Sequence, residues 1–241
     1  MEQIPLPLTL PKGLGLDAFV VGNNQEVLKA LRDWVRGSGQ RQLFLHGESG
    51  TGKTHLLHSA CQAAAEQGRR VLCLPLGHPD LAPAVLDDLE QLDDVAIDDI
   101  QAVAGDADWE RALFDLYNRL ADAGSGLLCA ARTPPVALGL RLADLQSRLS
   151  AGATYALQPL DDAGRNELLR RLVGERGLAI EPRVIDYILS HCPRAPAALV
   201  DLMDALDRAC WVKKRPVTVK LVGEVMATIA PAARERPGDI S

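Results

Sequence analysis

Apolar residues alternate along the chain between short uninterrupted runs and longer stretches with helical spacing. The short runs, typical of buried strands, are Leu43–Leu45, Val71–Leu74, Val95–Ile97, Leu127–Ala131 and Thr154–Leu157. The helical stretches fall before and between them, at 24–35, 55–67, 82–92, 109–123 and 142–149. Strands that alternate with segments long enough for a helix predict an α/β domain, in which a parallel sheet is flanked by helices on both faces.

The pattern changes at Pro159, after which only helical stretches occur. They lie at 161–173, 182–191, 197–211 and 217–227. We therefore predict an α/β base over 14–158 and a small all-α lid domain over 159–228. Residues 1–13 contain three prolines, which disfavour both a helix and a central strand, so this segment is expected to be flexible. Residues 229–241 are expected to form a frayed tail.

Composition and charge narrow the class of protein. Hydrophobic residues make up 47% of the chain and charged residues 24%, which is ordinary for a soluble globular protein. No apolar run approaches the ~18 residues that span a bilayer, and no export signal opens the chain, so we expect a cytoplasmic protein without a membrane partner. The five cysteines are scattered, which fits buried thiols better than disulfides or a metal site. A formal net charge of −6 argues against nucleic-acid binding as the main activity.

A complete phosphate-binding loop lies between the first predicted strand and the helix after it. It has the form G-x-x-x-x-G-K-T and consists of Gly47, Glu48, Ser49, Gly50, Thr51, Gly52, Lys53 and Thr54, followed by His55. Glycines let successive backbone N–H groups point at phosphate oxygens, and the helix N-terminus adds a partial positive charge. Lys53 is expected to reach the β- and γ-phosphates, and the Thr54 hydroxyl to bind Mg²⁺. The loop predicts binding of ADP or ATP, or another nucleoside diphosphate, together with Mg²⁺.

Two acids, Asp98 and Asp99, close the third predicted strand. In P-loop proteins an acid at the end of a neighbouring strand holds the water shell of Mg²⁺, and this is the role expected for Asp98. The second acid, Asp99, is the candidate catalytic residue that orients the attacking water, a general-base role. The alternative is a polar strand end that simply meets solvent.

Several further segments resemble the DnaA branch of the AAA+ ATPases. They are Phe19–Asn24, Gly50–His58, Ile97–Gln101 and Leu145–Leu149. The resemblance implies a AAA+ P-loop base with a helical lid, in which the backbone at Val20 and Val21 frames the adenine. It also implies that Arg148 is an arginine finger that acts in trans, on nucleotide held by a neighbouring subunit. A solvated arginine at a helix end is the alternative.

The first residues of the chain are similar to peptides that dock on the bacterial sliding clamp. The segment consists of Gln3, Ile4, Pro5, Leu6, Pro7 and Leu8. Gln3 offers a polar anchor, Leu6 and Leu8 offer side chains for an apolar pocket, and the prolines limit the entropy lost on binding. A flexible apolar chain start is the alternative.

Taken together, these segments resemble the regulatory DnaA homologues that inactivate the initiator. Residues 109–120 are especially similar to them, and the chain stops at Ser241 with no room for an initiator's DNA-binding domain. The resemblance implies a negative regulator of chromosomal replication initiation with two partners, the DnaA initiator and the sliding clamp (the β subunit of DNA polymerase III). It implies that the protein docks on DNA-loaded clamp and stimulates hydrolysis of DnaA-bound ATP. We expect DNA contacts mainly through the clamp; whether homo-oligomers form stays open.

Two sensor positions depart from the family pattern. Residues 129–133 offer no strongly polar side chain before Arg132. In the lid, Ala197 stands where the family has an arginine, and Arg194 lies almost one helical turn upstream. Arg132 and Arg194 are therefore the candidate sensors. Because the lid arginine is missing, we expect weak or no intrinsic ATP hydrolysis, and whether the chain is itself an enzyme stays open.

Two other functions fit the same residues. One is a self-sufficient AAA+ ATPase that remodels or loads DNA-bound replication proteins, favoured by the P-loop with its two acids but disfavoured by the missing lid arginine. The other is a nucleotide-gated adaptor that tethers partners, in which Arg148 has no catalytic role.

Overall fold

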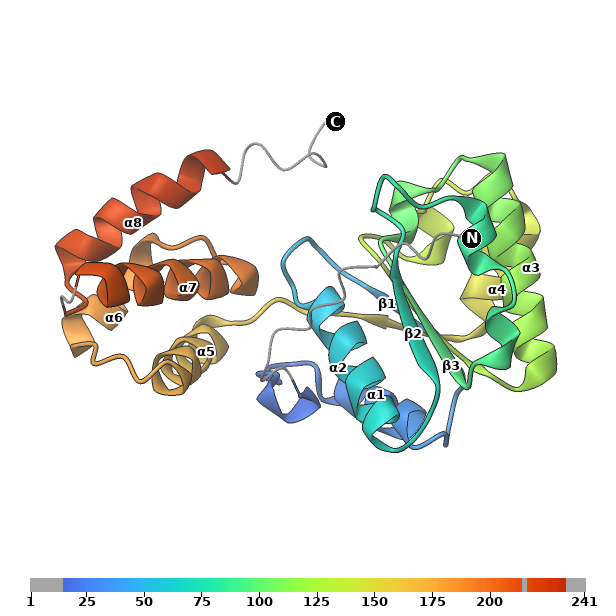
Figure 1. Cartoon of the computed structure of the whole chain (residues 1–241), viewed down its shortest axis with the longest axis horizontal. Coiled ribbons are helices and arrows are strands. Elements are labelled where there is room, and N and C mark those ends of the chain that lie inside the picture. The colour runs from blue at the N-terminus through green and yellow to red at the C-terminus, as the bar shows by residue number, and fades with distance from the viewer. Residues whose placement is uncertain (1–14, 214–215, 233–241) are drawn as a thin grey trace. The chain divides into compact units, whose positions relative to one another are not determined.

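The computed structural model describes residues 15–213 and 216–232 of the chain. The chain divides into two compact units, residues 1–158 and 159–241. We call the described part of the first unit the base and that of the second unit the lid (Figure 1). The segment predicted to be flexible, residues 1–13, lies outside the described residues.

The base contains a five-stranded parallel sheet. Its strands are β1 (Gln42–His46), β2 (Val71–Pro75), β3 (Asp94–Asp98), β4 (Gly126–Ala131) and β5 (Ala153–Ala156). They lie in the order β2-β3-β4-β1-β5, and every neighbouring pair is parallel. Each predicted strand is present to within one residue at either end, and the predicted fold class is confirmed. Parallel strands all end at one edge of the sheet, which we call the carboxyl edge, and start at the other, the amino edge.

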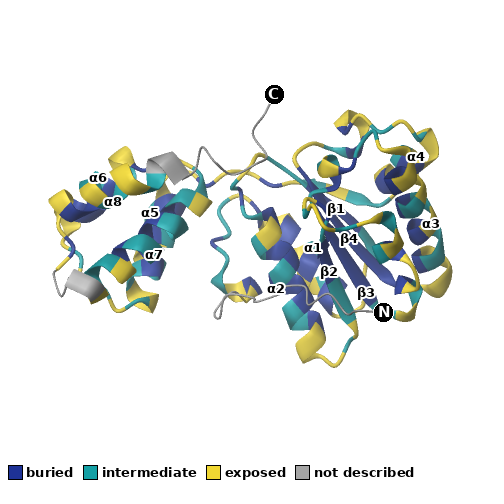
Figure 2. Ribbon diagram, turned by 45° about the horizontal axis from the view of Figure 1, so that its top comes forward, coloured by how far each residue is buried: buried dark blue, intermediate teal, exposed yellow. Residues whose placement is uncertain are grey.

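Helices cover both faces of this sheet (Figure 1). On one face α1 (Gln25–Val35) and α2 (Lys53–Glu66) pack against a cluster that includes Leu43 and Leu45 of β1. On the other face α3 (Ala107–Ala123) and α4 (Ala143–Ala151) pack against a cluster that includes Phe44. Successive strand residues point to opposite faces, so each strand supplies both clusters. The buried residues line the strands and the inner sides of the helices (Figure 2).

The helix predicted over 82–92 is wrong. The structure has two short 3-10 turns there, η2 (Pro83–Leu86) and η3 (Leu89–Gln91), with Asp88 between them in a left-handed conformation, φ 59°. A left-handed residue cannot continue an α-helix. The segment is held instead by Arg119 of α3, which donates 2.7 Å to the carbonyl O of Leu86 and 2.9 Å to the Glu90 carboxylate. The apolar spacing there reflects packing of the buried Leu86 and Leu89 on α3 rather than helix formation.

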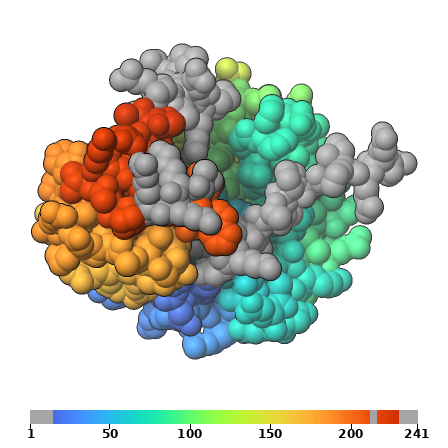
Figure 3. Space-filling view, turned by 60° about the vertical axis from the view of Figure 1, so that its left-hand side comes forward, coloured from blue at the N-terminus to red at the C-terminus, as the bar shows by residue number. Residues whose placement is uncertain are grey.

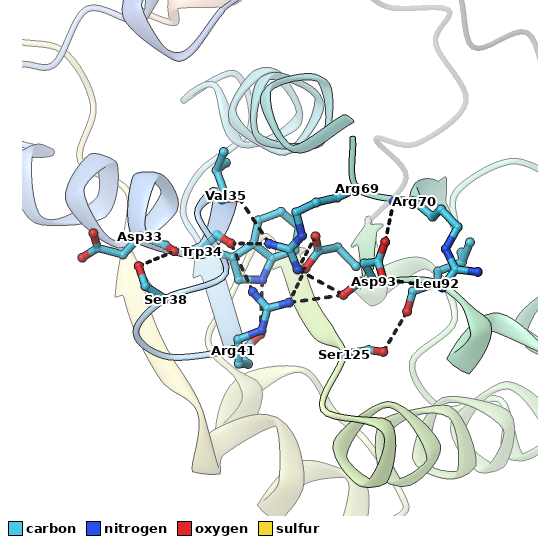
Figure 4. Close-up of polar contacts among 11 residues, drawn as sticks. Asp33, Trp34, Val35, Ser38, Arg41, Arg69, Arg70, Leu92, Asp93 and Ser125 are labelled. Atoms are coloured by element: carbon cyan, nitrogen blue, oxygen red, sulfur yellow. Dashed lines mark hydrogen bonds and ion pairs between the residues drawn. The ribbon is translucent and has the colours of Figure 1, made fainter. Parts of the chain in front are cut away.

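A buried ion cluster lies at the amino edge of the sheet (Figure 4). Asp94, the first residue of β3, has no solvent exposure, and Arg41 and Arg69 approach its carboxylate to 2.6 and 2.9 Å. Both arginines also donate to the carbonyl oxygens of Trp34 and Asp93. Burial raises the pKa of Asp94, and the two guanidinium groups offset part of that rise. The cluster therefore joins α1, β1, β2 and β3 where the strands begin.

The lid consists of four helices around its own apolar core. They are α5 (Asp162–Glu175), α6 (Pro182–His191), α7 (Pro196–Lys213) and α8 (Val219–Ala232). Their side chains form one continuous body in the space-filling view (Figure 3). The predicted end of the last helix at Ala227 is wrong, because α8 continues to Ala232 and Ile229 still packs against the core. Residues 229–232, expected in a frayed tail, are helical.

None of the helices in the described ranges is both long and apolar enough to cross a membrane.

Candidate nucleotide-binding site

The phosphate-binding loop lies at the carboxyl edge of the sheet, between β1 and α2. Two of its three glycines, Gly47 and Gly52, are required by their surroundings. A Cβ at Gly47 would lie 2.8 Å from the carbonyl O of Leu157, and one at Gly52 would lie 3.0 Å from the ring of Phe19. Gly52 is also left-handed, with φ 100°, and immediately precedes the first turn of α2. The loop can thus wrap closely without side chains between its backbone and a phosphate.

Lys53 is 7% exposed and lies at the start of α2. Its Nζ donates 2.7 Å to the carbonyl O of Gly47 and 2.8 Å to that of Glu48. Burial lowers the pKa of Lys53, and the nearby Asp98 and Asp99 carboxylates offset part of that fall. The Lys53 ammonium group is therefore held against the backbone of the loop, where it can bind an anion such as a phosphate.

The predicted metal ligands are brought together. Thr54 Oγ1 donates 2.5 Å to Asp98 Oδ2, and the backbone N–H of Asp99 donates 2.9 Å to the other carboxylate oxygen. Asp98 is 3% exposed, and burial raises its pKa, partly offset by the Thr54 hydrogen bond. Within the described residues no three His, Cys, Asp or Glu side chains form a metal site. This donor set fits Mg²⁺ that keeps most of its waters and binds phosphate oxygens, because Mg²⁺ needs few protein ligands.

The second acid, Asp99, is linked to the end of β4 through a residue that we did not single out from the sequence. Gln101 Nε2 donates 2.8 Å to Asp99 Oδ1, and the Arg132 backbone N–H donates 3.1 Å to Gln101 Oε1. Asp99 is left-handed, with φ 56°, and its carboxylate lies beside Gly77. Gln101 thus orients the predicted water-positioning acid and ties it to the candidate sensor segment. The sequence offered two signals for Gln101, its place two residues after Asp99 and its position at the end of the DnaA-like segment Ile97–Gln101.

The segment before α1 reaches the same edge of the sheet. Phe19 lies over Gly52, and its ring centroid is 5.9 Å from that of His55. Val20 is buried and Val21 is half-buried. Asn24, 2% exposed, donates 3.0 Å to the carbonyl O of Gln158 and accepts 2.8 Å from its N–H. This pair joins the start of α1 to the last residue of the base and fixes the segment that carries Val20 and Val21.

Arg148 lies far from this loop. It is exposed in the last turn of α4, on the opposite face of the sheet from α2. The end of α4 is at the amino edge, because a Cβ at Gly152 would lie 2.5 Å from the carbonyl O of Gln42, where β1 begins. A strand of this length spans about 16 Å, so the base places Arg148 across the sheet and toward the opposite edge from its own P-loop.

The remaining predicted residues lie in the lid or outside the described ranges. Arg194 is exposed before α7 and pairs with Asp162 at the start of α5. Ala197 is exposed in the first turn of α7. The six residues from Gln3 to Leu8 lie outside the described residues.

Solved structures with the same fold include initiator proteins. Domain III of DnaA from Thermotoga maritima matches with a TM-score of 0.80 and 22% identity, over 91% of this chain and 98% of that one. AMPPCP-bound DnaA from Aquifex aeolicus matches with a TM-score of 0.70 and 24% identity, over 81% and 65%. RuvB of Thermotoga maritima matches with a TM-score of 0.68 and 20% identity, over 89% and 72%. The base and lid thus have the AAA+ fold.

Family models match both units. Residues 10–74 match the bacterial DnaA ATPase domain, and residues 162–226 match the Hda lid domain. The chain is an Hda-like, DnaA-homologous AAA+ protein. The segment that matches the Hda lid includes Ala197, the position at which the resemblance to DnaA led us to expect an arginine.

Proposed function

We propose that this Hda-like protein is a negative regulator of chromosomal replication initiation. It docks on the DNA-loaded sliding clamp and presents Arg148 to ATP bound by DnaA, which is then hydrolysed. The matches to the DnaA ATPase domain and the Hda lid support a role in replication control.

The observation that carries the proposal is the position of Arg148. It is exposed, it lies on the face and edge of the sheet opposite its own P-loop, and among the described residues no carboxylate pairs with it. An arginine so placed cannot serve the nucleotide of its own subunit. Its planar fork of donors suits the γ-phosphate of a nucleotide held by a partner.

The P-loop supports the proposal that a nucleotide binds as a structural ligand, which the protein holds without rapid hydrolysis. We infer that ADP or ATP binds through the loop N–H groups and Lys53, with Mg²⁺ held by Thr54 and, through water, Asp98. Mg²⁺ would neutralise phosphate charge there. Ala197 removes the lid cation that would sense the γ-phosphate, so intrinsic turnover is expected to be slow. DnaA-type neighbours were solved with the ATP analogue AMPPCP.

Clamp docking is assigned to Gln3–Leu8, and contact with DNA is expected mainly through the clamp. The net charge of −6 supports contact with DNA through the clamp, because direct DNA binding would favour a basic surface. In the alternative, the chain is a self-sufficient remodelling ATPase. The intact arrangement of Lys53, Thr54 and Asp98 favours this alternative, and robust ATP turnover by the isolated protein would support it over the tethering adaptor.

The deciding experiment measures hydrolysis of ATP preloaded on DnaA, with DNA-loaded clamp and either wild-type protein or Arg148→Ala. We expect clamp-dependent stimulation by the wild type and its loss, by about 10³-fold or more in rate, in the variant. Arg36→Ala is the matched control, since Arg36 is a 66% exposed arginine on the other face of the base. Stimulation retained by Arg148→Ala would refute the role of Arg148 as a finger and favour the tethering adaptor.

A further inference from the structure

Helix α4, which carries Arg148, has little stability of its own. It contains nine residues, and its N-cap residue Leu142 makes no side-chain capping bond. Helices this short are unstable in isolation, so the direction of α4 must be set by what it packs on. Leu145 and Leu149 bury one side of it in the cluster shared with α3.

Glu110 of α3 binds the start of α4. It is 1% exposed and accepts hydrogen bonds from three backbone N–H groups: Leu142 at 2.7 Å, Arg141 at 2.9 and 3.1 Å, and Gly105 at 2.7 Å. Burial alone would raise the pKa of Glu110, but these hydrogen bonds outweigh it and the pKa lies below its ordinary value. The carboxylate thus binds the backbone N–H groups of Arg141 and of the N-cap residue Leu142, and its negative charge complements the dipole at the helix start.

Tyr117 lies seven residues after Glu110 on α3, and so on the same side of that helix. Its ring lies under the guanidinium of Arg148, with 5.9 Å between Arg148 Cζ and the ring centroid. A carboxylate partner would occupy the N–H donors of the guanidinium. An aromatic face holds the cation through its flat side and leaves the in-plane donors available for phosphate oxygens.

We propose that Glu110 and Tyr117 are positioning residues: one carboxylate fixes the start of α4, and one ring holds Arg148 with its donors free for a phosphate in another subunit. This inference rests on the proposed function. It adds that α3 holds Arg148 in its phosphate-binding orientation before the partner binds.

The test compares Glu110→Gln, Tyr117→Leu and Tyr117→Phe in the full chain. In the DnaA hydrolysis assay we expect Tyr117→Leu and Glu110→Gln to lower stimulation about three- to ten-fold, while Tyr117→Phe, which keeps the ring, stays near wild type. The matched control is Leu120→Val, a fully buried residue one turn further along α3. This variant shows how far a loss of thermal stability in α3 lowers stimulation when Glu110 and Tyr117 are unchanged.

Two readouts need no DnaA. The Nε–H signal of Arg148, assigned by its absence in Arg148→Ala, should be shifted upfield by the ring and should lose that shift in Tyr117→Leu but not in Tyr117→Phe. Amide exchange at Arg141 and Leu142 should quicken in Glu110→Gln.

The outcomes separate the two ideas. If Arg148→Ala stimulates normally, the proposed function fails. If Arg148→Ala is inactive but Tyr117→Leu and Glu110→Gln stimulate normally, the finger stands and the positioning role is refuted. Losses no larger than those of Leu120→Val would also refute it.

Discussion

Gly52 shows how much of the nucleotide site depends on single residues. It combines a left-handed backbone with a close approach by Phe19, so the loop and the segment before α1 meet only because no side chain stands between them. Asp99 is the opposite case, a non-glycine residue held left-handed beside the carboxylate of Asp98. The left-handed residue Gly52 belongs to the phosphate-binding loop, whereas the left-handed conformation of Asp99 directs its backbone N–H at the Asp98 carboxylate.

At this scale we predict that Gly52→Ala weakens mant-ADP binding about ten-fold or more, because the loop must shift away from Phe19 and its N–H groups lose alignment. Gly68→Ala is the matched control. Gly68 is also left-handed, φ 82°, but a Cβ there would meet nothing within 4 Å. Both variants should lose about 1–2 kcal/mol of stability from backbone strain, and only Gly52→Ala should lose nucleotide. Equal affinities in the two variants would contradict the role given to Phe19.

Elements are joined in the base by polar residues as well as by apolar packing. Glu110 joins α3 to α4, Arg119 holds the two 3-10 turns on α3, and Asp94 gathers α1, β1 and β2 around the start of β3. These polar contacts hold elements that are short, or whose sequence pattern predicts a helix or a strand only weakly. They explain why the segment 82–92 is ordered without being a helix.

The prediction at the element scale concerns Asp94. Asp94→Asn leaves Arg41 and Arg69 without their shared carboxylate, and we expect a loss of about 3 kcal/mol in the free energy of unfolding, measured by urea denaturation. Asp17→Asn breaks an exposed ion pair with Arg32 and should cost less than about 1 kcal/mol. Similar losses in the two variants would mean that the buried cluster contributes no more than a surface pair.

The whole molecule consists of two units that each have a core of their own. The clusters around β1 lie entirely within the base, and the buried residues of the lid cluster all lie within 169–222. The described parts of the nucleotide site, from Val20 to Arg132, all belong to the base. Ala197 and Arg194 belong to the lid.

We therefore predict that fragments 1–158 and 159–241 each fold alone and unfold cooperatively, as followed by circular dichroism. The lid fragment should have the lower stability, because a unit of that size buries a smaller fraction of its surface. The base fragment should keep measurable mant-ADP binding that Lys53→Ala removes. A base fragment that is unfolded would show that the base needs the lid in order to fold.

Features that depend on neighbouring residues were determined by the sequence alone. The P-loop could be predicted because its chemistry lies in eight consecutive residues, and the strands and most helices because their spacing reports which side is buried. The tertiary structure decided the rest. It brought Gln101 to the end of β4, set Glu110 against Arg141 and Leu142, and placed Arg148 over Tyr117 on the face away from its own loop. These partners are separated by up to about thirty residues, and chain spacing carries no record of which side chains meet when helices pack on a sheet.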